Sequence, residues 1–208
     1  MAKHPCPYSP EILVALDQLI QPGEHIHDPF AGTGVRLAAL CDRIGATYSG
    51  CDIEVWPDHD PRVTQGDSTL ASSYPGEPFT VCTSPVYLNK RLADYANGPG
   101  PNTKVKGRRD YGIALGRALH ENNLARHTGR ASRAAAYWRL HTEAAKHWGD
   151  RVILNVDLPI SDGWMQVLAG LGYTLADPIR CDTQRYGGLA NARLRAAYEV
   201  VIVATRPA

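Results

Sequence analysis

The segment TVCTSPVYLN (80–89) ends an apolar run in residues of very different chemistry. Ser84 offers a hydroxyl, Pro85 stiffens the backbone and leaves its carbonyl free to accept, and Tyr87 adds a flat aromatic ring. Val86 separates the proline from the ring. A stiff loop with a hydrogen-bonding edge beside a ring could hold a planar, polar group, so these residues are the first candidates for chemistry.

Three acidic residues stand where other predicted strands end. Asp28 opens DPFAGTG, in which Gly32 and Gly34 permit a tight turn into a helix whose free N–H groups can face a ligand. Asp52 follows the second predicted strand, where an acid can accept both hydroxyls of a ribose. Asp67 follows the third and is weaker evidence, because acids at strand ends also cap helices. The glycines do not form the dinucleotide fingerprint, since a leucine replaces its third glycine.

Strands and helices must alternate to bring these residues together. The predicted strands are HIHDPF (25–30), TYSGCDI (47–53), RVTQGDS (62–68), FTVCTS (79–84) and RVILNVDL (151–158), followed by YTLADPIRC and AAYEVVIVATR as an antiparallel pair. The hydrophobic spacing predicts helices over 34–44, 110–124, 132–148 and 162–171. This alternation predicts an α/β fold with a doubly wound, mostly parallel seven-stranded sheet and an antiparallel C-terminal strand pair. Ligands of such sheets bind beyond the carboxyl ends of the strands.

The composition indicates one globular domain over residues 1–208. The chain has 208 residues, of which 44% are hydrophobic and 21% charged, enough for a sizeable core. The N-terminus does not resemble a signal peptide and no apolar run reaches roughly 18 residues, so we expect a cytoplasmic protein. The five cysteines form no CxxC pair and are expected to be reduced core thiols. The eight histidines are scattered, so no metal site is expected.

Positive charge is concentrated in one basic segment, residues 88–139. It holds eleven Lys or Arg against three acids, a net charge of +8, whereas the whole chain carries +1. The stretch NGPGPNTKVKGRRDYG (97–112) combines turn residues with four cations and is expected to order on phosphates. This distribution favours a polyanionic partner over a plain solvated surface. The candidate phosphate-binding residues are Lys104, Lys106, Arg108 and Arg109, with Arg117, Arg126, Arg130 and Arg133 extending the track.

These pieces, in this order, resemble class I S-adenosylmethionine-dependent methyltransferases. Residues 28–34 resemble the family's first motif, Gly50-Cys51-Asp52 the second and Gly66-Asp67-Ser68 the third. The segment HPCPYSPEIL (4–13) resembles the one that lies over the methionine moiety in amino-methylating DNA enzymes. The resemblance implies a Rossmann-like methyltransferase sheet and S-adenosyl-L-methionine as the cofactor. It implies cofactor contacts from His4, Tyr8, Asp28, Phe30, Gly32, Gly34, Asp52 and Asp67.

The Ser84 loop resembles the catalytic loop of DNA methyltransferases that act on exocyclic amines, which reads Asp, Asn or Ser, then Pro-Pro, then an aromatic residue. The resemblance implies that Ser84 and the Pro85 carbonyl accept the amine hydrogens and orient the nitrogen lone pair for in-line attack. Tyr87 would stack on a base that has been flipped out of its duplex. This chain departs from the pattern at Val86, which replaces the second proline and relaxes the loop.

Two further stretches extend the likeness. SPVYLNKRLADY is similar to DNA methylases of bacteriophages, with Asn89 and Arg91 at matching positions, which implies a bacterial or phage-infected host cell. RYGGLANARLRAAYEVVIVAT resembles the end of the same family, where polar residues border the base pocket. Tyr186, Asn191 and Arg193 are the candidates there, and the alternative is a plain hairpin turn.

The residue types leave several functions open. Ser84 favours cytosine N4 over adenine N6, because acidic or asparagine versions of the loop are more usual for adenine. A related enzyme could methylate RNA or a protein glutamine, although Ser84 counts against the glutamine substrate. The chain could also be a nucleic-acid-binding homologue without catalysis, as Val86 allows. The chain could also methylate a small molecule, but such a substrate would not account for the positive charge of the basic segment.

Overall fold

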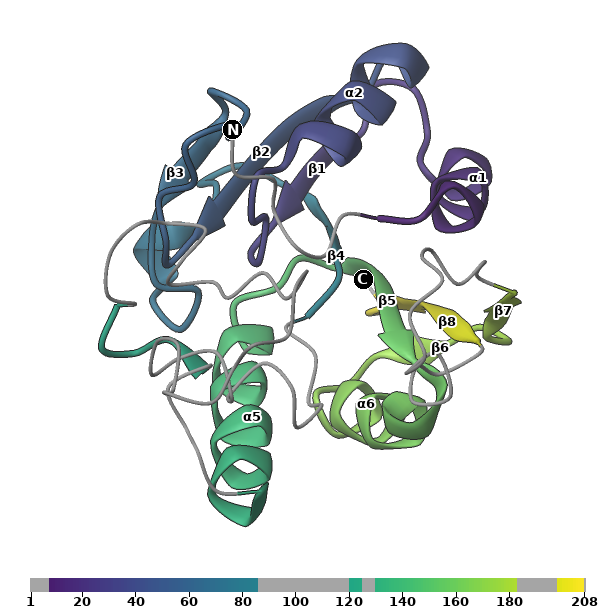
Figure 1. The fold of residues 1–208 in the computed structure, drawn as a ribbon. Coiled ribbons are helices and arrows are strands. Elements are labelled where there is room, and N and C mark those ends of the chain that lie inside the picture. Colours follow the sequence, from purple (N-terminus) through teal and green to yellow (C-terminus); the bar gives the residue numbers. More distant parts are fainter. Residues whose placement is uncertain (1–7, 86–119, 125–129, 183–197, 208) are drawn as a thin grey trace, which may run out of the picture.

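The computed structural model describes residues 8–85, 120–124, 130–182 and 198–207 (Figure 1). The elements are α1 (Pro10–Leu19), β1 (His25–Asp28), α2 (Val35–Ile44), β2 (Thr47–Asp52), β3 (Val63–Gln65), a 3-10 turn η1 (Ala71–Ser73), β4 (Thr80–Thr83), α5 (Arg130–Ala145), β5 (Arg151–Asp157), α6 (Leu158–Gly170), β6 (Thr174–Leu175), β7 (Ile179–Cys181) and β8 (Glu199–Thr205). Strands and helices alternate along most of the described chain, which is typical of a doubly wound fold.

One mixed sheet runs through the molecule in the order β3-β2-β1-β4-β5-β8-β6, with β7 also paired to β8. The strands from β3 to β5 are parallel, and β8 runs antiparallel to β5, β6 and β7. The predicted α/β sheet with an antiparallel C-terminal pair is therefore confirmed. The predicted sixth strand, YTLADPIRC, forms the two short strands β6 and β7, because Pro178 between them has no N–H to donate to a ladder.

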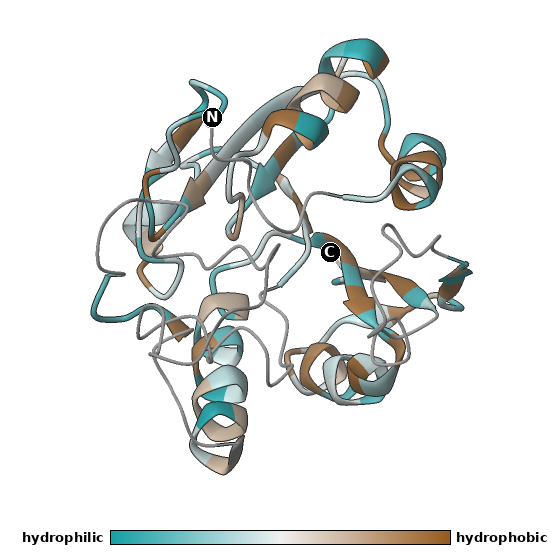
Figure 2. Ribbon diagram, viewed as in Figure 1, coloured by the Kyte–Doolittle hydropathy of each residue, from teal (hydrophilic) through white to brown (hydrophobic). Residues whose placement is uncertain are grey.

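Helices cover both faces of this sheet. Figure 1 shows α1 and α2 on one side and α5 and α6 on the other, and Figure 2 shows apolar residues along the middle strands. One core cluster joins α1 and α2 to the sheet through fully buried side chains such as Leu16 and Leu37. The other joins α5 and α6 to the opposite face through Tyr137, Leu154 and Trp164. Because helices cover both faces of the sheet, we expect a ligand to bind at the ends of the strands.

Helix α1 was not predicted, although a local signal for it exists. Ser9 caps the helix, because its hydroxyl accepts a hydrogen bond from the Ile12 N–H at 3.3 Å. Pro10 occupies the first helical position, where a missing N–H costs nothing. The buried residues Ile12, Ala15 and Leu16 then place one side of the helix on the sheet. A serine followed by a proline before an apolar spacing of three and four residues predicts such a start.

The other predicted helices were found with shifted ends. Helix α5 begins at Arg130 and connects β4 to β5, so it overlaps the end of the basic segment. Helix α6 begins at Leu158, four residues earlier than predicted. The helix predicted over 110–124 lies mostly outside the described residues, and residues 120–124 form a turn. None of the described helices combines the length and apolarity needed to cross a membrane.

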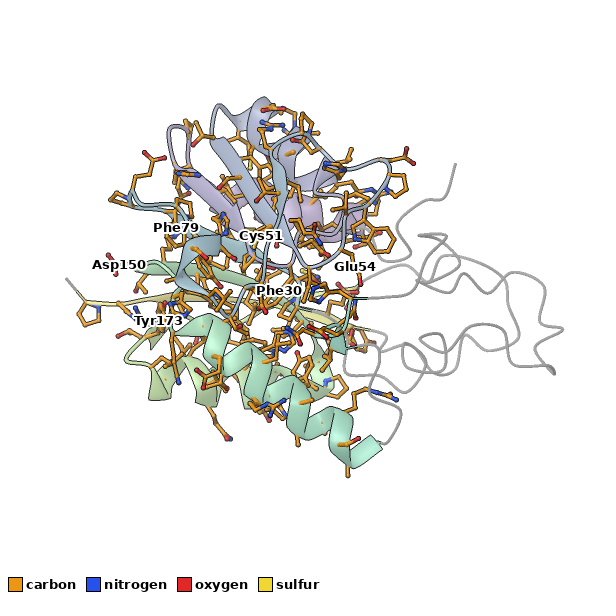
Figure 3. All side chains as sticks on the ribbon, turned by 90° about the vertical axis from the view of Figure 1, so that its left-hand side faces the viewer. Phe30, Cys51, Glu54, Phe79, Asp150 and Tyr173 are labelled. Carbon is orange, nitrogen blue, oxygen red and sulfur yellow. The ribbon has the colours of Figure 1, made fainter. Side chains whose placement is uncertain are left out.

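The strand ends define two opposite edges of the sheet. In Figure 3, Phe79 and Asp150, which precede β4 and β5, lie toward one edge. Phe30 and Glu54, which follow β1 and β2, lie toward the other edge. The acidic and serine residues selected from the sequence stand at or just after the carboxyl ends of parallel strands, so they belong to this second edge.

Candidate active site

A pocket opens at the carboxyl ends of β1, β2 and β4. Eight of the residues predicted from the sequence line it: Tyr8, Asp28, Phe30, Gly34, Asp52, Asp67, Ser84 and Pro85. Gly32 does not line the pocket but donates its N–H to Asp52 from within the same turn. Their roles in binding or catalysis remain predictions, but the fold places these residues around one space.

Asp28 is the last residue of β1 and lines the pocket. Its side chain is buried, and Oδ1 accepts hydrogen bonds from the Phe30 N–H at 3.1 Å and from Thr83 Oγ1 at 2.5 Å. Burial raises the pKa of Asp28 to about 7, and the nearby Asp52 contributes in the same direction. The two hydrogen bonds oppose this shift without cancelling it. A carboxyl group in this state gains its charge readily when a cation arrives beside it.

Asp52 ties the first-motif turn to the end of β2. Its Oδ2 accepts the Gly32 N–H at 2.8 Å, and its Oδ1 accepts the Glu54 N–H at 2.8 Å. Burial raises the pKa of Asp52 to about 6, although both backbone bonds lower it. Since a carboxylate offers about four acceptor sites, these two bonds and a hydrogen bond from the Trp56 side chain leave capacity for a hydroxyl of a ligand.

Two glycines, Gly34 and Gly50, allow the turn at 28–34 to pack closely against β2. Gly34 has φ +66° at the start of α2, and a Cβ there would lie 2.5 Å from Val63 Cγ2 and 2.6 Å from the Tyr48 hydroxyl. A Cβ on Gly50 would lie 2.9 Å from Ala31 Cβ. Both positions therefore exclude a side chain, and the N-terminus of α2 can approach a ligand with its free N–H groups.

Asp67 and Ser84 complete the set along the sheet edge. Asp67 Oδ1 accepts hydrogen bonds from the Thr69 N–H at 2.9 Å and from Thr69 Oγ1 at 2.7 Å, which orients the carboxyl group after β3. Ser84 and Pro85 directly follow β4 and line the pocket from the other side. The pocket thus has acids on its β1–β3 side and the Ser-Pro backbone on its β4 side.

Several lining residues were not selected from the sequence. They are Arg36, Glu54, Trp56, Asn122, Asn123 and Asn155. Arg36 lies in the first turn of α2 and donates a hydrogen bond to the Tyr8 carbonyl, which holds the N-terminal segment beside the pocket. A cation in the first turn of a helix interacts unfavourably with the helix dipole. This unusual position was the one local feature that could have marked Arg36 as a functional residue.

Glu54 links two distant parts of the chain at this site. It is 2% exposed, and its Oε1 accepts hydrogen bonds from the His120 N–H at 2.6 Å and from Asn123 Nδ2 at 2.9 Å. These bonds bring residues 120–124 to the rim of the pocket, where Leu124 is buried. No local pattern predicts this contact, because 69 residues separate Glu54 from Asn123.

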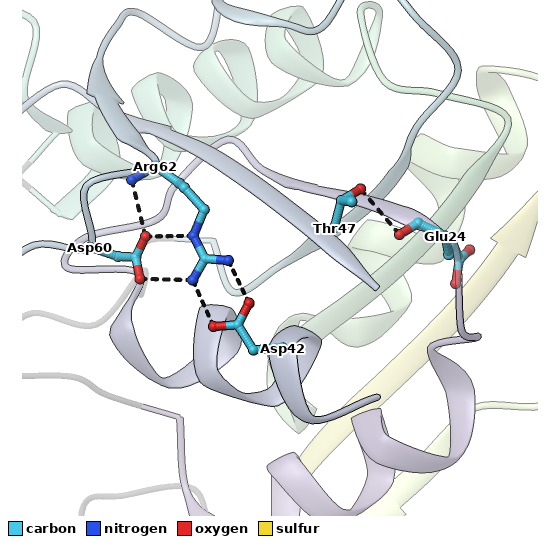
Figure 4. A network of polar contacts seen from close by, with 5 residues as sticks. All are labelled: Glu24, Asp42, Thr47, Asp60 and Arg62. Atoms are coloured by element: carbon cyan, nitrogen blue, oxygen red, sulfur yellow. Dashed lines mark hydrogen bonds and ion pairs between the residues drawn. The ribbon is translucent and has the colours of Figure 1, made fainter. Parts of the chain in front are cut away.

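The loop that carries Glu54 is fixed by an ionic network (Figure 4). Arg62 binds Asp60 through Nε at 2.8 Å and Asp42 of α2 through Nη1 at 2.6 Å. Hydrogen bonds from Arg62 hold the pKa of Asp60 below its usual range. The Asp60 N–H in turn donates to the Thr33 carbonyl at 2.7 Å. The loop between β2 and β3 is therefore attached to both α2 and the first-motif turn.

Other predicted residues lie outside the described part of the chain. They are His4, Tyr87, Asn89, Arg91, Lys104, Lys106, Arg108, Arg109, Arg117, Arg126, Tyr186, Asn191 and Arg193. Arg133 was predicted to extend the basic track, and this is wrong, because it is 3% exposed. Its place on α5, one turn before the buried Tyr137, turns it toward the protein interior.

The described residues include no candidate metal site, and the cysteines among them are free thiols. Within residues 8–85, 120–124, 130–182 and 198–207, no group of three His, Cys, Asp or Glu side chains could hold a metal ion. Cys41, Cys51, Cys82 and Cys181 are buried free thiols, as expected for core cysteines. Burial raises the pKa of Cys51 to about 12, which leaves its thiol inert at neutral pH.

Comparison with known proteins adds the fold family. Neither a protein-family model nor a curated protein sequence matches this chain. A provisionally named RNA methyltransferase from Pyrococcus horikoshii is 12% identical with a TM-score of 0.55, over 95% of this chain and 82% of that protein. The tRNA methyltransferase TrmK from B. subtilis is 11% identical with a TM-score of 0.50, over 97% of this chain and 67% of that one.

A third solved structure matches over nearly the full length of both chains. It is a provisionally named S-adenosylmethionine-dependent methyltransferase from Listeria monocytogenes, 10% identical with a TM-score of 0.50, over 95% of this chain and 97% of that one. At these identities the likeness concerns the backbone rather than the site. Together with the strand order, it shows that this chain has the α/β, Rossmann-like methyltransferase fold.

Proposed function

We propose that this chain transfers a methyl group from S-adenosyl-L-methionine to an exocyclic amine of a base in DNA, with cytosine N4 favoured over adenine N6. One observation carries the proposal: Ser84 and Pro85 line the same pocket as Asp28, Asp52 and Asp67. An amine-binding loop and a set of acids suited to the cofactor thus face one space. A methyl transfer needs this proximity between donor and acceptor.

The donor set of the pocket fits the cofactor. Asp28 is a buried acid whose raised pKa a cationic ligand would bring down, and the cofactor carries an ammonium and a sulfonium. Asp52 has acceptor capacity for a ribose hydroxyl, and the N-terminus of α2 suits a carboxylate. When bound, S-adenosyl-L-methionine supplies an electrophilic methyl group.

The chain's own residues would prepare the amine. A base amine is a poor nucleophile because its lone pair is delocalised into the ring. In our proposal, the Ser84 hydroxyl and the Pro85 carbonyl accept the amine hydrogens and turn the lone pair toward the methyl group. Phe30, Trp56 and Leu124 form an apolar part of the same pocket and limit water there. The target base would leave its duplex to reach this depth.

The position of the basic segment supports a polyanionic substrate. The segment starts three residues after Pro85, and its described residues 120–124 return to the rim of the pocket. Cations that flank a site are well placed to hold the phosphates on either side of a flipped base. In this reading Lys104, Lys106, Arg108 and Arg109 bind the nucleic-acid backbone, while Tyr87 stacks on the base.

Transfer to a base in RNA is the second candidate. Two of the similar solved structures are named RNA or tRNA methyltransferases, and single-stranded RNA offers bases that are already unstacked. The Ser84-Pro85-Val86-Tyr87 loop favours DNA, because it resembles the loop of the amino-methylating DNA enzymes. The two candidates share the cofactor and the amine chemistry and differ in the polymer.

Methyl transfer from radiolabelled S-adenosylmethionine separates these functions. The protein is incubated with duplex DNA, single-stranded DNA or tRNA, and the labelled product is digested to nucleosides. We expect label in N4-methylcytosine from DNA, strongly reduced in Ser84→Ala and in Tyr87→Ala while cofactor binding persists. Label in RNA alone would select the second candidate. Label in protein alone, or in none of the polymers while the cofactor binds, would overturn the nucleic-acid assignment.

The salt dependence of binding tests the role of the basic segment. If four to six cations contact phosphates, the slope of log affinity against log salt on duplex DNA should be about −4 to −5, from about −0.9 per contact. Replacing Lys104, Lys106, Arg108 and Arg109 together by alanine should flatten the slope by up to about three units. An unchanged affinity and slope in this variant would mean that these four residues are a solvated surface.

A further inference from the structure

Asn155 is the one polar residue in the buried stretch 152–156 of strand β5. It is 3% exposed, and its neighbours Leu154 and Val156 belong to the core. Strands β4 and β5 are parallel and pair Thr83 with Leu154, so Asn155 comes next along β5 just as Ser84 comes next along β4. Asn155 lines the pocket together with Ser84 and Pro85. The fold therefore places a buried amide beside the proposed amine-binding loop.

The orientation of this amide follows from its partner. Asn155 Nδ2 donates a hydrogen bond to Glu199 Oε2 at 2.9 Å. A carboxylate only accepts hydrogen bonds, so the nitrogen must face Glu199 and the oxygen must face away from it. Glu199 thus determines which end of the Asn155 amide is available to a ligand.

The Asn155 amide oxygen has no donor of its own in the described chain. Oδ1 is buried and makes no hydrogen bond within residues 8–85, 120–124, 130–182 and 198–207. Buried acceptors without a donor are unfavourable and uncommon in native proteins. An oriented acceptor without a donor, in the wall of a pocket, fits a site whose ligand brings the N–H group.

We infer that Asn155 Oδ1 accepts a hydrogen from the target amine and makes the site selective for a base that carries an NH₂ group. The inference rests on the proposed function. An exocyclic amine has two hydrogens, and the Asn155 amide oxygen would join the Ser84 hydroxyl and the Pro85 carbonyl as a third acceptor around them.

The same geometry explains which bases the site would reject. Thymine and uracil present a carbonyl oxygen where cytosine presents its amine. That oxygen would face the Asn155 amide oxygen, and neither has a hydrogen to share. A site built to bind an N–H group rejects an analogue without it, because its buried acceptors are left unpaired. Asn155 is therefore a specificity-determining residue for cytosine or adenine over the carbonyl-bearing bases.

A binding experiment with amine-free bases tests this assignment. The probes are single-stranded oligo(dT) with one interior dC and the same strand with 2-pyrimidinone deoxynucleoside, which lacks the amine. A second pair compares adenine with purine. Affinities are measured by fluorescence anisotropy at saturating S-adenosylhomocysteine. We expect the wild type to prefer the amine-bearing strand of one pair by about 10-fold, and Asn155→Leu to reduce this preference to about threefold or less, since one neutral hydrogen bond corresponds to roughly 2- to 12-fold.

Two further variants separate ligand binding from folding. Asn155→Leu is similar in size and removes both the unpaired acceptor and the donor to Glu199 Oε2, so these opposing effects should leave its melting temperature near that of the wild type. Asn155→Ala should show the same loss of preference. The control is Ser161→Ala, because Ser161 is also buried, belongs to the adjoining α6, and bonds only to the Leu158 carbonyl among the described residues. It should keep the full preference for the amine.

The outcomes distinguish the inference from the function on which it rests. If the wild type prefers an amine and both Asn155 variants keep that preference, the inference is wrong and the proposed function stands. If the wild type shows no preference in either pair, both are wrong. A loss of S-adenosylhomocysteine binding in both folded Asn155 variants would place Asn155 at the cofactor and would also overturn the inference.

Discussion

The two sides of the pocket differ in how far apart their residues lie in the sequence. The cofactor side, as we propose it, consists of Asp28, Asp52 and Asp67, each of which stands at or just after the end of one of the first three strands within a short glycine-containing motif. The amine side of the same proposal comprises Ser84 and Asn155, with Asn123 on the rim of the pocket, and these residues come from three separate segments. The first side is built from local turns, whereas the second forms only when distant segments pack together.

This difference predicts where changes are tolerated. On the cofactor side, the turn at 28–34 lies against β2 with no space for added atoms, and its acids are bound by backbone N–H groups. On the amine side, the Glu54 side chain binds residues 120 and 123 across a long stretch of sequence. Changes in the first region should therefore affect the fold and the cofactor together, and changes in the second should affect the substrate alone.

Gly34→Ala should have the largest effect. The new Cβ would overlap Val63 and Tyr48, and the residue would keep a left-handed backbone. Overpacking and backbone strain together should lower the free energy of unfolding by about 2–4 kcal/mol and abolish binding of S-adenosylhomocysteine. Urea unfolding and calorimetry measure the two effects.

Gly23→Ala is the matched control for this change. Gly23 has a similar φ of +79°, but a Cβ there meets no atom within 4 Å. It should lose only about 1 kcal/mol of unfolding free energy and keep full cofactor affinity. Equal losses in the two variants would show that the tight approach at Gly34 does not matter.

Asp28→Asn should move stability and affinity in opposite directions. Because the pKa of Asp28 is raised to about 7 in the folded state, the folded protein binds more protons than the unfolded chain between about pH 4 and pH 7. The free energy of unfolding therefore falls as pH rises through this window, and Asp52 acts in the same direction. The variant should flatten this dependence.

At pH 8, the asparagine variant should be more stable than the wild type by about 1–3 kcal/mol, because it buries no charge. It should bind S-adenosylmethionine at least about tenfold more weakly, since one charge-assisted contact is lost. Thermal unfolding over a pH series and calorimetry at pH 8 test both halves of the prediction. A variant that gains stability and keeps its affinity would remove Asp28 from the cofactor site.

Glu54→Ala should affect the amine side alone. The change removes the acceptor for the His120 N–H and for Asn123 Nδ2, and keeps the backbone N–H that binds Asp52. We expect methyl transfer to nucleic acid to fall by about tenfold or more, from an interaction of about 1–3 kcal/mol, with cofactor affinity changed by less than about threefold. Glu143→Ala, on the exposed surface of α5, is the control. A parallel loss of cofactor affinity would mean that the two sides are not separable.

The ionic network at the β2–β3 loop should give the smallest effects. Asp60→Ala removes a half-buried carboxylate that accepts both the side chain and the N–H of Arg62, and should cost about 1 kcal/mol of unfolding free energy. Asp42→Ala should change the melting temperature much less, because that carboxylate is largely exposed. A reversed order would indicate that the contact between Arg62 and α2, rather than the contact between Arg62 and Asp60 within the loop, holds the loop in place.

The same contrast explains what could be predicted from the sequence. The turn at 28–34 and the acids after the strands were found because each is encoded within a few adjacent residues. Asn155 gave no signal, since one asparagine in RVILNVDL reads as an interruption of an apolar strand and its partner Glu199 lies 44 residues away. Arg133 was misjudged because charge was counted along the chain, whereas α5 turns that residue inward. Local motifs predict the acids and the Ser84 loop, whereas Asn155 and the contact of Glu54 with residues 120–124 are seen only in the tertiary structure.

Calorimetric titration with S-adenosylhomocysteine is the decisive test of this pocket, because both of its sides depend on the cofactor. We expect binding to one site in the wild-type protein. In Asp52→Ala, we expect the binding free energy to be weaker by about 1.5–3 kcal/mol, the range for a lost hydrogen bond to a charged group. Absence of binding to the folded wild type, or equal affinity in the variant, would contradict the assignment of this pocket.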